Sequence, residues 1–239
     1  MTVSTIILGA GKGTRMKSPT PKILHKIAGK ELIAFSIDLA NAVKSKETIV
    51  VVSEETEQDT RKALSGKKIK FCLQKKQLGT GDAVKIATKN LKSRSKYTLV
   101  LYADTPFVTK RTIKRMISEA NKGSEIVFLG FQTQTKNSYG KFKIAQKKTL
   151  IDIVEKNEPG YSTLDSLSNS GILLARSNII ADLIKKIKNN NAQQEFYLTD
   201  IVKIASKHGY SSTYAQCDED ECLGVNSQLE LSIAERKFQ

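Results

Sequence analysis

The chain has 239 residues, a hydrophobic content of 39% and a formal net charge of +15. This length suffices for one large globular domain, and the hydrophobic content excludes an intrinsically disordered chain. No basic segment precedes the first short apolar run, and no stretch approaches about 18 apolar residues, so we expect neither a secretory leader nor a membrane span. Three cysteines without a CxxC pair and only two histidines argue against a zinc site, so we expect reduced thiols and a cytoplasmic protein.

The positive charge is spread along the chain rather than gathered in one block. No run of about five or six like charges occurs, no RNA-binding or zinc-finger pattern is present, and aromatic residues do not interleave with the basic ones. Most lysines therefore fit solvated helix faces and loop tips, and we expect no nucleic-acid partner. A small anionic substrate would also benefit from the positive field.

Strand and helix patterns alternate in the first half of the chain. Continuous β-branched runs such as ETIVVVSE (47–54) indicate strands buried on both faces, whereas ELIAFSIDLANAVKS (31–45) carries apolar residues at helical spacing. Thr109 is suited to cap the helix that follows it. Repeated β-α-β units with short links predict a mostly parallel, doubly wound sheet. We expect strands at 4–10, 47–54, 68–73, 97–104 and 125–132, and helices at 31–45, 54–64, 81–91 and 109–121.

The second half of the chain has a different character. Residues 140–156 fit two strands around a Lys-Lys turn, which would form a small inserted β region. Residues 168–180 fit a strand that runs into a helix start. No linker, repeat or low-complexity segment interrupts the sequence, so we expect residues 1–239 to form a single α/β domain with helices on both faces of its sheet. The remaining expected elements are helices at 182–190, 197–209 and 227–238 and a strand at 211–217.

The stretch LGAGKGTRMKSPTPK (8–22) follows the first expected strand. In open parallel sheets, ligands bind beyond the carboxyl ends of the strands, and glycines there allow several N–H groups to approach phosphate oxygens. The spacing matches neither a Walker P-loop nor GxGxxG. Arg15 can clamp phosphate oxygens with two hydrogen bonds, Lys22 can supply a point charge, and two prolines stiffen the segment that holds Lys22. This combination favours an anion-binding loop over an ordinary tight turn.

The sequence LGAGKGTRMKSPTPKILHKIAGK (8–30) resembles the opening of the sugar-nucleotide pyrophosphorylases. Further similar segments follow in the order of that family: QKKQLGTGDA (74–83), YADTP (102–106), YGKF (139–142), IVEK (153–156), NSGI (169–172), NNNAQQEFYLTDI (189–201) and GVNSQLELS (224–232). The last two are similar to those of the N-acetylglucosamine-1-phosphate uridylyltransferases in particular. The resemblance implies a three-layer, Rossmann-like nucleotidyltransferase fold whose mixed central sheet is mostly parallel.

The resemblance also implies a reaction and its central residues. A phosphate oxygen of N-acetylglucosamine 1-phosphate would attack the α-phosphorus of UTP in line, giving UDP-N-acetylglucosamine, a cell-wall precursor, and pyrophosphate. In the family pattern Arg15, Lys22 and Asp104 are catalytic, and Asp104 and Asn226 hold the cofactor Mg²⁺. Without the resemblance, Asp104 would be read as an ordinary turn residue and Asn226 as a helix cap.

The implied nucleotide-binding residues come from the first half of the chain. The side chain of Gln74 carries both a donor and an acceptor, which match the O4 and N3–H edge of uracil. Gly79 and Thr80 would complete the base pocket, partly through backbone groups. The implied set is Leu8, Gly9, Ala10, Gly11, Gly13, Gln74, Gly79, Thr80 and Tyr102.

The implied sugar-phosphate pocket comes from later segments. Glu155 can accept hydrogen bonds from sugar hydroxyls, whereas Tyr197 can equally be a core or rim aromatic residue. Glu195 fits a structural role better than that of a base, because the attacking phosphate oxygen is already anionic. The implied set is Gly140, Glu155, Asn169, Tyr197 and Thr199.

Several positions depart from the usual family pattern. Gly9 stands in place of alanine, Ala103 and Gln194 in place of glycine, Lys141 in place of arginine, and Ser170 in place of threonine. These changes leave open a related nucleotidyltransferase that acts on another hexose or MurNAc-type 1-phosphate. A non-catalytic nucleotide or nucleic-acid binder is the other alternative.

The hexapeptide repeats of the acetyltransferase half of the bifunctional enzymes are missing from this sequence. We therefore expect no C-terminal left-handed β-helix, and a monomer or weak oligomer. The chain would be either a naturally short enzyme or the first domain of a longer one.

Overall fold

The computed structural model describes residues 2–133, 137–162 and 167–238. Within these ranges, no helix combines the length and apolar character needed to cross a lipid bilayer. The strands are β1 (Val3–Leu8), β2 (Lys26–Ile27), β3 (Lys30–Glu31), β4 (Thr48–Val52), β5 (Lys70–Leu73), β6 (Tyr97–Tyr102), β7 (Ile126–Phe131), β8 (Lys141–Ile144), β9 (Leu150–Val154), β10 (Ser168–Arg176) and β11 (Ser212–Cys217). The α-helices are α1 (Leu32–Ala42), α2 (Glu54–Ala63), α3 (Thr80–Asn90), α4 (Lys110–Asn121), α5 (Ser177–Leu183), α6 (Ile201–Lys207) and α7 (Gln228–Phe238).

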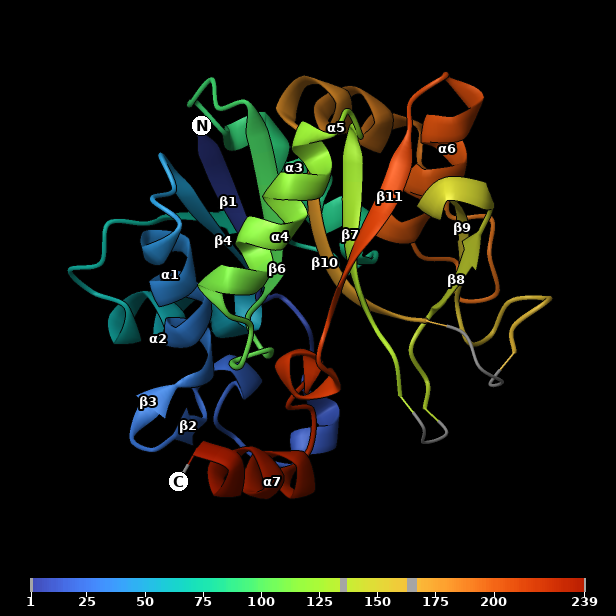
Figure 1. Cartoon of the computed structure of the whole chain (residues 1–239). Helices are drawn as coiled ribbons and strands as arrows, with labels where there is room; N and C mark the ends of the chain where they lie inside the picture. The colour runs from blue at the N-terminus through green and yellow to red at the C-terminus, as the bar shows by residue number, and fades with distance from the viewer. Residues whose placement is uncertain (1, 134–136, 163–166, 239) are drawn as a thin grey trace.

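The central sheet has the strand order β11-β7-β10-β6-β1-β4-β5 (Figure 1). All its neighbours pair in parallel except β10, which runs antiparallel to both β6 and β7. Leu8 pairs with Tyr102 on one side and with Val51 on the other, so the carboxyl ends of these strands lie at one edge of the sheet. The expected mostly parallel mixed sheet is confirmed.

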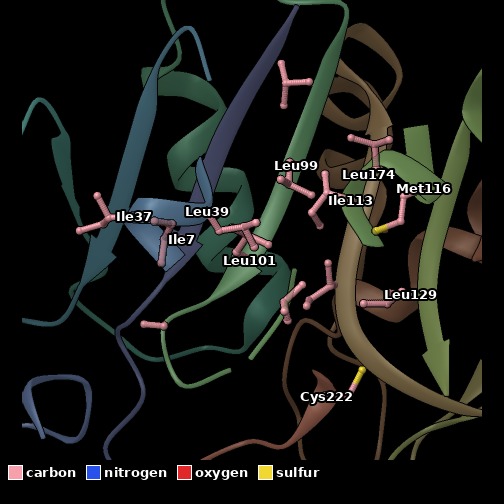
Figure 2. Packing of buried hydrophobic residues seen from close by; sticks show 14 of the residues in the cluster. Ile7, Ile37, Leu39, Leu99, Leu101, Ile113, Met116, Leu129, Leu174 and Cys222 are labelled. Atoms are coloured by element: carbon pink, nitrogen blue, oxygen red, sulfur yellow. The ribbon is translucent and has the colours of Figure 1, made fainter. Parts of the chain in front are cut away.

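Helices cover both faces of this sheet because its strands alternate their apolar side chains. Ile7, Leu99 and Leu101 face the cluster that includes residues of α1 and α4, as Figure 2 shows, whereas Ile6 and Val100 face α3, α5 and α6. All five side chains are at most 1% exposed. The result is the three-layer arrangement that the sequence predicts.

The inserted β region is a hairpin of β8 and β9, joined to β10 where Ser168 pairs with Lys141. The prediction of two strands around a Lys-Lys turn is therefore confirmed. Two details differ from expectation. The helix expected at 182–190 does not form over that range: α5 ends at Leu183, and a 3-10 turn (Ile184–Lys186) follows it. The chain is extended from Ile187, because the asparagine-rich segment after it favours turns. The short β2–β3 hairpin was not anticipated.

The last segment of the chain returns to the carboxyl edge of the sheet. Figure 1 shows α7 beyond that edge, and its first residue, Gln228, donates a hydrogen bond to the backbone oxygen of Met16 at 3.1 Å. The backbone N–H of Val225 donates to the oxygen of Asp104 at 2.9 Å. These contacts place residues 224–228 beside the glycine loop that follows β1.

Candidate active site

Two contiguous cavities lie at the carboxyl edge of the sheet. The first has a volume of about 480 Å³ and the second about 320 Å³. Five residues line both, so the cavities share a boundary: Thr80, Tyr102, Asp104, Glu195 and Asn226. A ligand with two parts could therefore occupy both at once.

The glycine loop borders the first cavity with its backbone. The N–H of Gly9 donates to the oxygen of Val51 at 2.9 Å, which continues the sheet into the loop. Gly13 has a φ of +64°, and a Cβ at this position would lie 2.8 Å from the Cβ of Lys22. Only glycine fits both constraints, and its close approach fixes Lys22 behind the loop.

Lys22 connects the two residues expected to hold a metal. It begins a 3-10 turn (Lys22–Leu24), and its Nζ contacts Asp104 Oδ2 and donates to Asn226 Oδ1 at 3.0 Å. The Lys22 and Asp104 side chains are only 13% and 15% exposed, so the ion pair is shielded from water. Ser227, not Asn226, caps α7, because its Oγ accepts from the N–H of Glu230 at 3.2 Å. Asn226 is thereby free to point into the cavities.

This arrangement is suited to bind a divalent cation. One carboxylate oxygen and one amide oxygen converge on the same cationic group, the Lys22 ammonium, which acts as a stand-in for a metal ion. No cluster of three or more histidine, cysteine, aspartate or glutamate side chains able to hold a metal occurs in the described ranges. Two protein oxygens supplemented by phosphate oxygens and water fit Mg²⁺, which retains much of its hydration.

Gln74 lies directly after β5 and is 3% exposed at the wall of the first cavity. Its Nε2 donates to the backbone oxygen of Gly79 at 3.2 Å and to Asp82 Oδ2 at 2.9 Å. The expectation that Gln74 offers a donor to a base is therefore wrong, and its role as an acceptor stays a prediction. Asp82, in the first turn of α3, had not been anticipated, and it occupies the donor.

The second cavity is acidic. Glu155 follows β9, and its Oε1 accepts a hydrogen bond from Thr199 Oγ1 at 2.9 Å. Burial raises the pKa of the Glu155 carboxyl, the Thr199 hydrogen bond opposes this rise, and the negative charges of Asp200 and Glu158 add to it. This carboxylate is therefore well placed to accept hydrogen bonds from a ligand that carries hydroxyl groups.

The other expected sugar-pocket residues surround Glu155. Burial, together with neighbouring carboxylates, raises the pKa of Tyr197 to about 12, and its hydroxyl donates to Gln193 Oε1 at 3.1 Å. Asn169 is 6% exposed, and its N–H donates to the oxygen of Gly140 at 2.8 Å. A Cβ at Gly140 would lie 3.1 Å from Glu155 Oε2, so a larger residue would crowd the carboxylate.

Most of the expected site residues line one of these cavities. Those at the first are Leu8, Gly9, Ala10, Gly11, Lys22, Gln74, Gly79, Thr80, Tyr102, Asp104 and Asn226, and those at the second include Gly140, Glu155, Asn169, Tyr197 and Thr199. Gly13 lines neither and acts through its contact with Lys22. Arg15 lies in a 3-10 turn (Thr14–Met16), is exposed and lines neither cavity, so the structure does not bring it to the site.

Other residues that line the cavities were not expected from the sequence. Gln77 lines the first cavity and donates to the backbone oxygen of Ala10 at 3.1 Å, which ties the segment after β5 to the glycine loop. Cys222 lines the second, and its Sγ lies 3.2 Å from that of Cys217. Gln77 lies within the QKKQLGTGDA segment (74–83), whose resemblance to the family could have marked its amide as a candidate site group. Nothing in the sequence signals Cys222.

Comparisons with known proteins bear on the family and the fold of the chain. The model of the MobA-like NTP transferase domain family matches residues 5–189. The chain is 38% identical over 242 residues to the bifunctional protein GlmU of Ruegeria sp. (strain TM1040), a match that covers 100% of this chain and 53% of the relative. It is 37% identical over 240 residues to the bifunctional protein GlmU of Caulobacter vibrioides, covering 99% and 52%. These matches confirm the resemblance seen in the sequence.

The chain spans about half the length of the curated relatives it matches. Among solved structures, it is similar to a putative glucose-1-phosphate thymidylyltransferase from Bacillus anthracis in complex with a sucrose, with a TM-score of 0.78. That match covers 99% of this chain and 95% of the other at 19% identity, so it shows a shared fold.

Proposed function

Because the chain belongs to the family of MobA-like NTP transferase domains, we propose that it is a uridylyltransferase that makes UDP-N-acetylglucosamine from UTP and N-acetylglucosamine 1-phosphate. The similarity of the whole chain to about half of each GlmU protein supports this choice of substrates. The bond between the α- and β-phosphates of UTP breaks, pyrophosphate leaves, and a bond forms between the sugar-phosphate oxygen and the α-phosphorus.

One observation carries the proposal: Lys22, Asp104 and Asn226 meet at the boundary between the two cavities. In the reaction, the two substrates must meet at the α-phosphorus. A cation and two oxygen ligands at the junction of a glycine-bordered cavity and an acidic cavity are where that meeting would be expected.

The chain's own residues have the following roles. The glycine loop binds the triphosphate through backbone N–H groups, and Lys22 moves from its Asp104 contact to the phosphates, where its charge stabilises the transition state. Glu155, Asn169 and Thr199 orient the sugar so that its phosphate oxygen faces the α-phosphorus. No base is required, because the attacking oxygen is already ionised at neutral pH.

Asp104 and Asn226 would hold Mg²⁺, which neutralises phosphate charge when bound. Arg15 would reach the phosphates only after the loop that carries it moves, since it is exposed in the present conformation. We further propose that residues 1–239 act as one nucleotidyltransferase domain in the cytoplasm, as a monomer or weak oligomer.

A pyrophosphate-release assay tests this function. The purified chain is incubated with Mg²⁺, each of the four NTPs and a panel of sugar 1-phosphates, with the Asp104→Ala variant as the blank. Selective release with UTP and N-acetylglucosamine 1-phosphate is the expected result. Release with a different sugar 1-phosphate would identify that compound as the substrate in place of N-acetylglucosamine 1-phosphate. No release with any pair would reject the proposed function.

A further inference from the structure

The amide of Gln74 has one orientation that its surroundings permit. Its two neighbours on the Nε2 side are the backbone oxygen of Gly79, at 3.2 Å, and Asp82 Oδ2, at 2.9 Å. A carbonyl and a carboxylate oxygen only accept hydrogen bonds, so the amide must turn its NH₂ group toward them. Rotation by half a turn would set Oε1 against two other oxygens in a site where Gln74 is only 3% exposed.

Both hydrogens of the Gln74 amide are thus used within the protein. Gln74 lines the first cavity, and Oε1 is the polar atom that remains to meet a ligand there. The side chain that could in principle donate or accept therefore presents an acceptor.

Asp82 is the residue that enforces this orientation. It lies in the first turn of α3, where the helix dipole stabilises a negative charge, and it is only part-exposed. A hydrogen bond to a carboxylate is also stronger than one to a neutral oxygen, so the contact with Asp82 outweighs that with Gly79. Asp82 is not among the residues that line either cavity, so it acts on a ligand only through Gln74.

We propose that Asp82 is a positioning residue that sets base selectivity by fixing Gln74 as an acceptor. This inference rests on the proposed function, which brings a pyrimidine nucleotide into the first cavity. An acceptor at Gln74 pairs with the N3–H of an imide pyrimidine such as uracil or thymine. Cytosine has a lone pair at N3, which the Gln74 oxygen repels. The Asp82–Gln74 pair therefore admits imide pyrimidines and rejects cytosine.

The first test changes the protein. In Asp82→Asn the new amide can donate to Gln74 Oε1, so the Gln74 amide can flip and offer its NH₂ group to cytosine. The ratio of kcat/KM for UTP to that for CTP should fall by about tenfold, the size expected for one hydrogen bond gained or lost. Asp182→Asn is the control, because Asp182 is 73% exposed on α5 and pairs only with Lys185 among the described residues.

The second test changes the ligand. Binding of UTP, CTP and 3-methyluridine triphosphate to wild type and to Asp82→Asn is measured by titration calorimetry, which needs no turnover. The methyl group removes the N3–H, so wild type should bind 3-methyluridine triphosphate at least about tenfold more weakly than UTP.

The outcomes separate this inference from the proposed function. A UTP-to-CTP ratio that falls in Asp82→Asn and stays constant in Asp182→Asn supports the role of Asp82. Equal losses with UTP and CTP would show a purely structural role and overturn it, as would a wild type that does not discriminate between UTP and 3-methyluridine triphosphate. If wild type releases no pyrophosphate, the proposed function fails, and the binding ratios still decide the role of Asp82.

Discussion

The two cavities meet at one edge of the sheet, yet they are built with opposite chemistry. The first alone is bordered by the cations Lys12 and Lys22 beside the glycine loop, and the second alone by the carboxylate of Glu155, whereas Asp104 and Glu195 lie at the boundary that they share. Backbone N–H groups and ammonium groups suit phosphates, and carboxylates suit hydroxyl donors. The proposed substrates would therefore bind in one direction, with their phosphates toward the glycine loop and the hydroxyl-rich sugar toward Glu155.

The cavities also differ in how the chain builds them. The first uses loops that follow the parallel strands β1, β5 and β6. The second gathers Glu155, which follows β9, with residues of β10 and of the 3-10 turn Leu198–Asp200. Asn226, near the end of the chain, lines both. A substitution at the shared boundary should therefore impair both halves of the site, and one inside a single cavity should affect only that half.

The largest effect is expected at the boundary. Asp104→Ala removes the carboxylate that pairs with Lys22 and should lower kcat by at least about 10², close to 3 kcal/mol of transition-state stabilisation. The fold should persist, because the Asp104 contact with Val225 uses only the backbone. Pyrophosphate release and thermal unfolding measure the two effects. Asp59→Ala, on the exposed side of α2, is the control, and near wild-type turnover in Asp104→Ala would defeat the assignment.

Lys22→Met should separate the phosphate side from the metal ligands. Turnover should fall by about 10², because a charge that stabilises the transition state is lost. Without nucleotide, the variant should bind Mn²⁺ more tightly, by at least about tenfold, because the ammonium no longer contacts Asp104 and Asn226.

Electron paramagnetic resonance of Mn²⁺ measures this affinity without any turnover. Lys17→Met is a suitable control, since Lys17 is exposed and lines neither cavity. An unchanged or weaker Mn²⁺ affinity in Lys22→Met would show that the ammonium and the metal do not compete.

Glu155→Gln tests the acidic side. The KM for the sugar 1-phosphate should rise by about tenfold, because a charged acceptor is lost, while the KM for UTP stays nearly constant. A rise in both KM values would contradict the division of the site into two chemically distinct halves.

The same variant should change the pH dependence of stability. Burial raises the pKa of Glu155 above its usual 4.5, so the folded protein holds this proton more tightly than the unfolded chain. In wild type this group therefore contributes a loss of stability as the pH rises from about 4.5 through its raised pKa, and Glu155→Gln lacks that contribution. The melting temperature of the variant should exceed that of wild type at pH 8 and equal it near pH 4. A difference that is the same at both pH values would refute a titration effect.

The sequence predicts the fold well because its signals are local. Continuous β-branched runs such as 47–54 and the Thr109 cap, whose hydroxyl accepts from the N–H of Thr112 at 3.2 Å, both appear as expected. The helix at 182–190 was misplaced because the apolar residues of this segment lie at helical spacing, whereas the asparagines after it favour turns. Propensity alone could not decide where the helix ended.

The site was predictable where a motif carries it and not where it depends on three-dimensional neighbours. The donor of Gln74 is occupied by Asp82, eight residues later, and only the fold shows this. Ala103, a departure from the family pattern, is fully buried in the core. A Cβ added at Gly9, another departure, would lie 3.7 Å from the Cβ of Ala103. An alanine at position 9 would therefore contact Ala103, and the sequence does not reveal that these two departures lie so near each other.

The smallest effect is expected on the loop that leads to the second cavity. Gln194, which departs from the glycine of the family pattern, has a φ of +56° and is exposed, so this departure strains the backbone without filling the cavity. Its backbone N–H donates to the backbone oxygen of Asn191, and its backbone oxygen accepts a hydrogen bond from Asn189 Nδ2. Both contacts use only the backbone of residue 194, so they persist in Gln194→Gly. That variant should gain about 0.5 to 1 kcal/mol, or roughly 1 to 4 °C in melting temperature. Gln194→Ala keeps the Cβ and should gain nothing, so equal gains in the two variants would show that the side chain, not the backbone, is the source.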